Sequence, residues 1–321
     1  LSRGLLELRE LIAERQYIEN GLIYNPEKEI IITPGAKQAI FYALASIINP
    51  GDEIIVPEPY WLSYRDIISL LGGKLIGVKS RFEDRFIPDI EDIGKLITQK
   101  TKAVLLNTPV NPTGIVWDKK DLIKLCEIIL TNDLYLISDE IYDRIVFDGK
   151  KHISPLGFPG MKERGILVNG FSKTYAMTGW RIGYLCASSE LTGHIIKIHQ
   201  HLATCSPEFV QLAAIEALRR NQDIYIPYVK YYQKARDILF EAISKSPSLK
   251  AVRPEGTFYM LVDISKISGD CEEAALWLLE KQGIATTPGS AYGGSASKTV
   301  RLSFAIPENE IHMAAETIRR I

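Results

Sequence analysis

The sequence predicts an α/β protein with a three-layer α/β/α large domain, built on a mainly parallel sheet, and a smaller α+β domain at the C-terminus. Three observations lead to this fold class. A chain of 321 residues with 46% hydrophobic content can bury a large core and is long enough for two domains. Apolar runs rich in β-branched residues recur through the first two-thirds of the chain. Helical patterns separate several of these runs, and such alternation is typical of a sheet covered by helices on both faces.

Seven apolar runs are the expected strands of the large sheet. They do not alternate with polar residues, which indicates strands that are buried on both faces and therefore a largely parallel sheet. Ligands of such sheets bind at the carboxyl ends of the strands, so we expect the functional site there. The runs cover residues 30–33, 53–57, 74–78, 103–107, 134–138, 165–168 and 182–187.

Helices are expected between these strands. One should cover residues 36–48, and another should form where apolar residues recur at i, i+3, i+4 and i+7 between residues 122 and 129. Ser206 and Pro207 suit the N-cap and the first position of a third helix.

The last third of the chain predicts a second, smaller domain. Pro227 is expected to interrupt a helix that resumes over residues 231–243. We place the domain boundary near it, with residues 1–223 in the large domain and residues 224–321, including the interdomain helix, in the small one. Strands are expected at 257–262, 284–287 and 299–304, with helices at 272–281, closed by Gly283, and at 308–318.

Composition excludes several classes of function. The 38 basic and 39 acidic residues leave a net charge of −1, which gives no electrostatic reason to expect nucleic acid or a membrane surface as a partner. Neither a metal-binding H-E-x-x-H motif nor a membrane-length apolar run occurs. The four cysteines lack C-x-x-C spacing, which suits a reducing cytoplasm.

Three segments carry the chemistry. They read NTPVNPTG at 107–114, SDEIY at 138–142 and NGFSKTYAMTGWRIG at 169–183. Each alone has an ordinary interpretation as a turn, a buried carboxylate or a surface lysine. In this order they resemble the fold type I enzymes that use pyridoxal 5′-phosphate, specifically the aspartate aminotransferase-like members of the class I/II aminotransferases. The resemblance runs from Gly4 to the C-terminus, and it implies this fold, this cofactor and amino-group transfer.

The resemblance implies three catalytic residues. Lys173 matches the lysine that forms a Schiff base with the cofactor and then moves a proton on the substrate, a task that requires an amine of low pKa. Asp139 matches the carboxylate that keeps the pyridine nitrogen protonated, and Tyr142 the phenol that donates to the ring oxygen O3′. Asn111 matches the amide that contacts the same oxygen and the substrate. From the residues alone, a helix N-cap at Asp139 and a turn position at Asn111 remain open.

The resemblance also implies a phosphate site and a ring contact. Arg181 and Ser172 match phosphate donors, since a guanidinium fork binds an anion by charge-assisted hydrogen bonds. Gly35, Ala36 and Lys37 open a helix directly after a strand, where backbone N–H groups can cap an anion. Trp61 matches the aromatic residue whose ring stacks on the pyridine of the cofactor. The alternative is that Trp61 is an ordinary core tryptophan.

Arg301 matches the arginine that grips the substrate α-carboxylate. It stands as a lone charge in the apolar run 299–304, where a cation needs a partner. A planar guanidinium binds a carboxylate through two parallel hydrogen bonds. The alternative is an ion pair with a carboxylate in its own domain.

We therefore expect a cytoplasmic homodimer that moves an amino group between an L-amino acid, aspartate-type by preference, and a 2-oxo acid such as 2-oxoglutarate. A C–S lyase or an aminocyclopropane-carboxylate synthase-like enzyme on the same fold is the alternative. A second is the aminotransferase-like effector domain of a regulator, against which the balanced charge argues. The chain begins at Leu1, and an N-terminal arm that relatives carry is expected to be missing.

Overall fold

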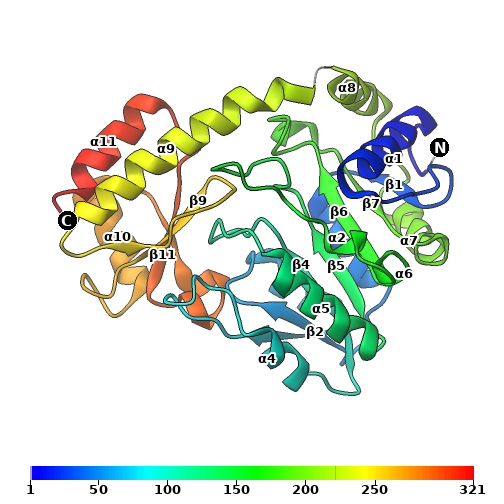
Figure 1. The fold of residues 1–321 in the computed structure, drawn as a ribbon, viewed down its shortest axis with the longest axis horizontal. Helices are drawn as coiled ribbons and strands as arrows, with labels where there is room; N and C mark the ends of the chain where they lie inside the picture. The colour runs from blue at the N-terminus through cyan, green and yellow to red at the C-terminus, as the bar shows by residue number, and fades with distance from the viewer. Residues whose placement is uncertain (1, 221) are drawn as a thin grey trace.

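The computed structural model describes residues 2–220 and 222–321, which form two sheets with helices packed around each (Figure 1). The larger sheet has seven strands in the order β1-β7-β6-β5-β4-β2-β3. Only β7 runs against the other strands, so the sheet is mainly parallel, as predicted. The strands are β1 (Ile30–Thr33), β2 (Glu53–Pro57), β3 (Lys74–Val78), β4 (Thr101–Asn107), β5 (Tyr135–Asp139), β6 (Gly165–Gly170) and β7 (Gly183–Cys186).

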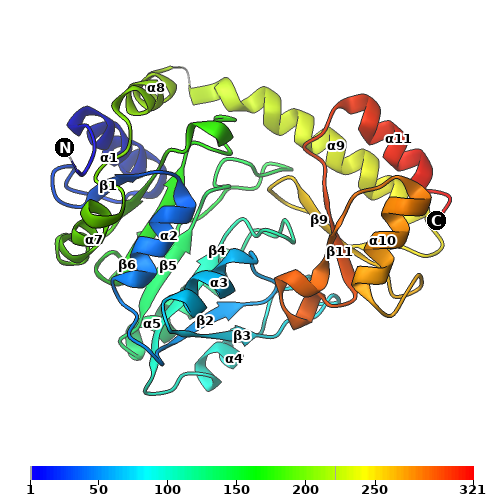
Figure 2. The ribbon, with the colours of Figure 1, turned by 180° about the vertical axis from the view of Figure 1, so that it is seen from behind.

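Helices cover both faces of this sheet, which confirms the predicted three layers. One face carries α1 (Leu6–Asn20), α4 (Ile90–Lys95), α5 (Lys119–Thr131), α6 (Met161–Arg164) and α8 (Glu208–Arg219). The other face, seen in Figure 2, carries α2 (Ala36–Ala45), α3 (Ser63–Leu70) and α7 (Ser189–Leu202). Each layer has its own apolar core cluster against the sheet.

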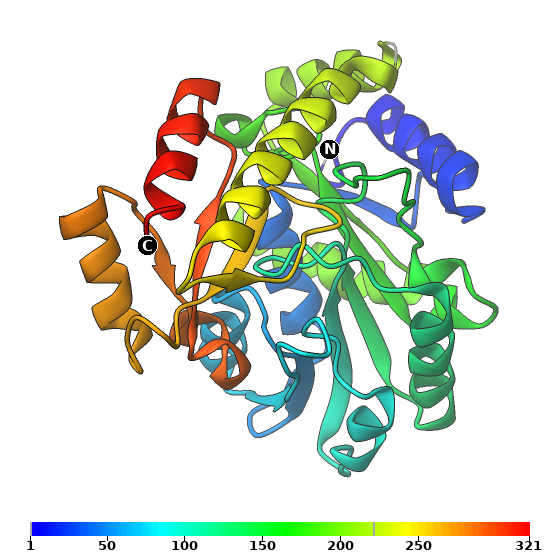
Figure 3. The ribbon, with the colours of Figure 1, turned by 60° about the vertical axis from the view of Figure 1, so that its left-hand side comes forward.

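The C-terminal part forms the smaller domain around a four-stranded antiparallel sheet of order β10-β11-β9-β8. The long helix α9 (Ile226–Lys245) spans from the large domain to this one and packs beside α11 (Figure 3). The remaining elements are α10 (Cys271–Gln282), α11 (Glu308–Ile318), β8 (Lys250–Ala251), β9 (Tyr259–Asp263), β10 (Thr287–Pro288) and β11 (Thr299–Ser303). The exact boundary between residues 223 and 224 stays a prediction.

Short 3₁₀ helices complete the fold at η1 (Pro155–Gly157), η2 (Thr178–Trp180), η3 (Gln222–Tyr225), η4 (Gly289–Tyr292) and η5 (Gly294–Ala296). Among residues 2–220 and 222–321, no helix combines the length and apolar character needed to cross a bilayer.

Two helix starts differ from the prediction. Ser206 and Pro207 are not N-cap and first position, because Pro207 is itself the extended N-cap residue and α8 begins at Glu208. The Ser206 carbonyl instead accepts a hydrogen bond from Gln211 Nε2 at 2.7 Å. Pro227 does not interrupt a helix, since it lies in the first turn of α9, where its missing N–H is not needed.

Two strands of the small domain also differ. The strand predicted from residue 257 begins at Tyr259, because Thr257 has a positive φ of 61°, outside the β region. The strand predicted at 284–287 is reduced to β10, a two-residue strand at the edge of the sheet. It contains Pro288, which suits an edge because proline has no N–H to donate to a further strand.

The fold brings the predicted motifs together at one edge of the large sheet. β4 ends at Asn107 and β5 ends at Asp139, and these two residues are direct partners in the parallel register. The segment with Lys173 follows β6, the next strand of the sheet. The site is therefore assembled at the carboxyl ends of adjacent strands, as expected.

Candidate active site

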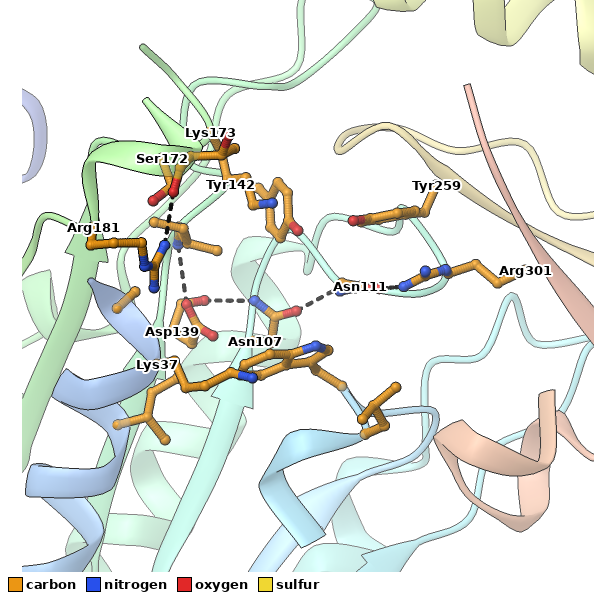
Figure 4. A pocket seen from close by; sticks show the side chains of 16 residues that line it. Lys37, Asn107, Asn111, Asp139, Tyr142, Ser172, Lys173, Arg181, Tyr259 and Arg301 are labelled. Atoms are coloured by element: carbon orange, nitrogen blue, oxygen red, sulfur yellow. Dashed lines mark hydrogen bonds between the residues drawn. The ribbon is translucent and has the colours of Figure 1, made fainter. Parts of the chain in front are cut away.

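A cavity of about 420 Å³ opens at these strand ends, between the large domain and the strands β9 and β11 of the small one (Figure 4). This is an ordinary size for a small-molecule site. Except for Gly35, all the predicted site residues line it. The lining consists of Ala36, Lys37, Ile40, Trp61, Leu62, Asn107, Asn111, Asp139, Ile141, Tyr142, Ser172, Lys173, Thr178, Arg181, Tyr259 and Arg301.

Lys173 is a partly buried amine that faces aromatic rings. Its Nζ lies 5.3 Å from the centre of the Phe258 ring and 5.8 Å from that of Tyr142. Burial lowers the pKa of Lys173, and the guanidinium groups of Arg301 and Arg181 lower it further, whereas Asp139 acts in the opposite direction. The side chain thus differs from a solvated surface lysine and has the lowered pKa that a nucleophilic amine needs.

Asp139 is a buried carboxylate at the last position of β5, only 4% exposed. Its Oδ2 accepts a hydrogen bond from the Tyr64 hydroxyl at 2.6 Å, and its Oδ1 accepts one from the Ile141 N–H at 3.2 Å. Burial raises the pKa of Asp139 to about 6, although these two hydrogen bonds lower it. The described segment after β5 is a turn rather than a helix, so Asp139 is not a helix N-cap. The carboxylate is satisfied but has no cation paired to it within the described chain.

Tyr64 was not anticipated from the sequence. It lies on α3, is fully buried, and burial followed by the proximity of Asp139 raises its pKa well above the usual value. It therefore stays a hydrogen-bond donor. The only sequence signal is its spacing, one helical turn after Trp61, whose ring meets the Tyr64 ring edge-on at 5.4 Å.

Asn111 is held by a second residue that the sequence did not single out. Asn107 donates from Nδ2 to the Asp139 carbonyl at 2.8 Å and accepts the Asn111 N–H at 2.7 Å. The amide oxygen of Asn111 then accepts a hydrogen bond from Arg301 at 3.1 Å. Asn111 is thus a buried bridge between the strand ends and the small domain (Figure 4).

Tyr142 follows Asp139 by three residues and is 3% exposed. Burial raises its pKa well above the ordinary value, with a further rise from the neighbouring Tyr259 hydroxyl. Its ring packs edge-on against Phe258 at 5.6 Å. The phenol is therefore a protonated donor at the cavity wall.

The start of α2, together with Arg181, forms an anion cradle. Gly35 is the N-cap at φ 92°, and the first-turn N–H groups of Ala36 and Lys37 have no acceptor inside the helix. The positive φ favours glycine here, because side chains rarely adopt this conformation, and the missing Cβ leaves room for Arg181, whose Nη2 would lie 2.6 Å from it. Ser172 lines the same cavity. These groups suit a phosphate.

Arg301 has no carboxylate partner among the described residues, so the predicted alternative of an ion pair in its own domain is not found. Its Nη2 donates to Thr287 Oγ1 at 3.4 Å, in addition to the Asn111 bond, and its buried Nε lacks a hydrogen bond in the described structure. The guanidinium carbon lies 4.2 Å from the centre of the Tyr259 ring and 5.1 Å from that of Tyr292. The cavity therefore holds an uncompensated, oriented guanidinium.

Pyridoxal 5′-phosphate fits this set of residues. An amine of lowered pKa, a buried carboxylate without a cation and an anion cradle line one cavity, and these match the aldehyde, the pyridine nitrogen and the phosphate of that cofactor. Within the described residues, no cluster of three or more His, Cys, Asp or Glu side chains is arranged to hold a metal ion.

Comparisons with known proteins decide the family. Residues 2–318 match the family described as aminotransferase class I and II. The chain belongs to this family.

Its relatives cover nearly all of it. The aspartate/prephenate aminotransferase of Thermus thermophilus is 41% identical over 322 residues, which is 99% of this chain and 81% of the relative. Aromatic-amino-acid aminotransferase 2 of Thermococcus litoralis is 34% identical over 99% of this chain and 82% of its own length. A solved structure of aspartate aminotransferase from Thermus thermophilus with maleate has a TM-score of 0.92 at 40% identity, covering 99% of this chain and 82% of the other.

This class I/II aminotransferase is accordingly a transferase that depends on pyridoxal phosphate. The resemblance read from the three motifs is confirmed. The lyase, ring-closing and regulator alternatives gain no support from these aminotransferase relatives.

Proposed function

We propose that the enzyme exchanges an amino group between a dicarboxylic amino acid, aspartate by preference, and 2-oxoglutarate. The observation that carries the proposal is the number of free cations in one cavity. Besides Lys173, which is assigned to the cofactor, Lys37, Arg181 and Arg301 line it, and none of these three forms an ion pair with a carboxylate of the described residues. A phosphate and an α-carboxylate account for two of them. The third suits a second carboxylate on the substrate.

Lys37 is the candidate for that second carboxylate. Its Nζ lies 4.9 Å from the centre of the Trp61 ring, so the ammonium is held at the cavity wall by a cation–π contact. The name of the Thermus thermophilus relative, aspartate/prephenate aminotransferase, agrees with an acidic substrate. The aromatic specificity in the name of the Thermococcus litoralis relative indicates that the family alone does not fix the substrate.

The protein residues would hold the cofactor at four points. Lys173 would hold it covalently, Asp139 would bind the pyridine nitrogen, and the donors Tyr142 and Asn111 would bind the ring oxygen. Arg181, Ser172 and the α2 N-terminus at Gly35, Ala36 and Lys37 would bind the phosphate, with Trp61 against the ring face. When bound, the cofactor supplies an electron-withdrawing ring that stabilises negative charge on the substrate carbon.

Lys173 is the proposed acid and base at the substrate Cα. Because its pKa is lowered, a larger fraction of the amine is neutral and able to accept a proton near neutral pH. Arg301 would orient the α-carboxylate by two parallel hydrogen bonds. Asn111, which already accepts from Arg301, would fix that orientation relative to the strand ends.

We also propose a homodimer. Large apolar side chains are exposed at and beside residues 60–64 and 201–207, the two segments that we propose face the partner. They include Leu62 at 37%, Leu202 at 59% and Phe209 at 71% exposure. A protein partner that packs against these segments would cover these apolar groups. A cytoplasmic location stays a prediction.

A screen of single amino acids tests the proposed substrate. The purified enzyme with cofactor and no 2-oxo acid is mixed with each amino acid in turn, and one equivalent of the matching 2-oxo acid is expected from aspartate and glutamate. In Lys37→Met, the advantage of aspartate over phenylalanine should fall by about tenfold or more, because a charge-assisted contact is lost. If the wild type converts aspartate and phenylalanine equally well, the dicarboxylic assignment is refuted.

A further inference from the structure

Arg301 is oriented by aromatic rings. Of its three guanidinium nitrogens, one donates to Asn111 and one to Thr287, and the third has no partner in the described structure. Two hydrogen bonds, one of them 3.4 Å long, leave the plane of the group weakly fixed. The Tyr259 ring, whose centre lies 4.2 Å from the guanidinium carbon, is the closer of the two aromatic contacts.

The register of β9 and β11 produces this contact. Arg301 pairs with Leu261 and Ser303 pairs with Tyr259, so Arg301 and Tyr259 are diagonal neighbours on the same face of the sheet. Diagonal pairs are within reach of aromatic and long side chains. Tyr259 also packs against Phe258, since the two ring centres lie 4.8 Å apart.

The same tyrosine reaches the other half of the site. Its ring meets Tyr142 edge-on at 6.1 Å, and burial followed by the proximity of Tyr259 raises the pKa of Tyr142. Figure 4 shows Tyr259 between Tyr142 and Arg301, with its hydroxyl directed toward Tyr142. Tyr259 therefore contacts both the proposed carboxylate-binding group and the proposed cofactor donor, one from each domain.

We propose that Tyr259 is a positioning residue with two separable roles: its ring holds the Arg301 guanidinium in the plane that receives the substrate α-carboxylate, and its hydroxyl holds Tyr142. This inference rests on the proposed function. A cation–π contact in a desolvated site is strong enough to matter for carboxylate binding. The hydroxyl contact should matter for turnover, because it acts on Tyr142 and leaves Arg301 untouched.

Two substitutions separate the roles. Tyr259→Leu removes ring and hydroxyl, and Tyr259→Phe removes only the hydroxyl. Tyr228→Leu, at a residue on α9 that is 49% exposed, is the matched control. Three quantities are measured on each protein with cofactor: the Kd for maleate, the kcat with the best amino acid of the screen, and the cofactor content. Maleate is chosen because it is a dicarboxylate that cannot be transaminated.

Tyr259→Leu should weaken maleate binding about tenfold or more with unchanged cofactor content. Tyr259→Phe should bind maleate within about twofold of the wild type, while its kcat falls by about fivefold, because the polar group beside the Tyr142 phenol is lost. Tyr228→Leu should resemble the wild type in all three. If Tyr259→Leu does not fold, Tyr259→Met gives the same comparison with a flexible apolar side chain.

Unchanged maleate binding in the Leu or Met variant would overturn the role of the ring. Equal losses of maleate binding in the Phe and Leu variants would overturn the separation of the two roles. A wild type that makes no 2-oxo acid from any amino acid would instead refute the proposed function, so the two failures are distinguishable.

Discussion

At the scale of single residues, the account depends most on Lys173. Its amine lies at the cavity wall with a pKa lowered by burial and by two arginines, so it combines position with reactivity. Lys173→Ala should abolish the covalent link to the cofactor and lower kcat by roughly 10³-fold or more. Borohydride reduction followed by peptide mass analysis detects the link, and Lys197→Ala, at an exposed position on α7, is the control. Ordinary turnover by Lys173→Ala would contradict the assignment.

Asp139 should cost stability in the cofactor-free protein. Its pKa is raised from 3.8 to about 6, so the folded state disfavours the ionised form, and this penalty is present above pH 6 and disappears as pH falls toward 4. The difference corresponds to roughly 3 kcal/mol. Asp139→Asn should therefore raise the free energy of unfolding by about 1–3 kcal/mol at pH 8, with little effect at pH 4.5, while it removes activity.

Urea unfolding of the cofactor-free protein at the two pH values measures this effect. Asp148→Asn is the control of opposite sign, because Asp148 has a pKa lowered by its hydrogen bonds from the fully buried Arg236. That control should lose stability at pH 8. If Asp139→Asn is also destabilised at pH 8, Asp139 is a structural residue and its proposed role is wrong.

At the scale of elements, the anion cradle depends on how closely β7 approaches the start of α2. A Cβ on Gly183 would lie 2.6 Å from the Ala36 nitrogen and 2.7 Å from the Gly35 carbonyl carbon, both of them backbone atoms. Gly183→Ala should therefore displace the α2 N-terminus, weaken cofactor binding by about tenfold or more and cost roughly 1–3 kcal/mol of stability. Gly193→Ala is the matched control.

Gly193 lies inside α7, and a methyl group at this position would meet no other atom within 4 Å. Its replacement by alanine should therefore stabilise the protein slightly, by roughly 0.5–1 kcal/mol. Cofactor affinity is measured by titration of the cofactor-free proteins, and stability by thermal melting. Equal cofactor affinity in Gly183→Ala and the wild type would show that the cradle does not depend on this contact.

The elements that the sequence predicted best are those with one clear pattern. The strands of the large sheet are visible in the sequence as unbroken apolar runs, and all seven occur with small shifts at their ends. Two of them differ from the expected buried parallel type, since β7 is antiparallel to its neighbours and the edge strand β3 is only partly buried. Helix α1 was missed because its buried face includes Arg9, Arg15 and Gln16 beside Leu8 and Ile12, so it has no apolar stripe. The backbone of Thr257 and the start of α8 depend on tertiary contacts that no local pattern encodes.

The site residues that the sequence predicted are likewise those that stand in a clear pattern. Lys173, Asp139, Tyr142, Asn111, Arg181 and Arg301 stand in motifs, and the structure gathers them around one cavity. Tyr64, Asn107 and Tyr259 act through other residues, and their contacts cross between elements distant in the chain. Such partners become visible only when the fold is known.

At the scale of the whole molecule, the proposed dimer is open to direct measurement. Sedimentation at micromolar concentration should give twice the chain mass of 36.0 kDa. Leu202→Asp should shift the protein toward the monomer, because a charge would be buried against a partner at an exposed apolar position. A wild type that is fully active as a monomer would contradict the homodimer.

The central claim is that this chain moves an amino group from aspartate to a 2-oxo acid. The most direct test follows the nitrogen atom itself: the purified enzyme with pyridoxal phosphate is given ¹⁵N-labelled L-aspartate and 2-oxoglutarate, and the products are analysed by mass spectrometry. The account predicts the label in glutamate, with an equal amount of oxaloacetate. Label released as ammonia, as in an elimination, or absence of labelled glutamate would contradict it.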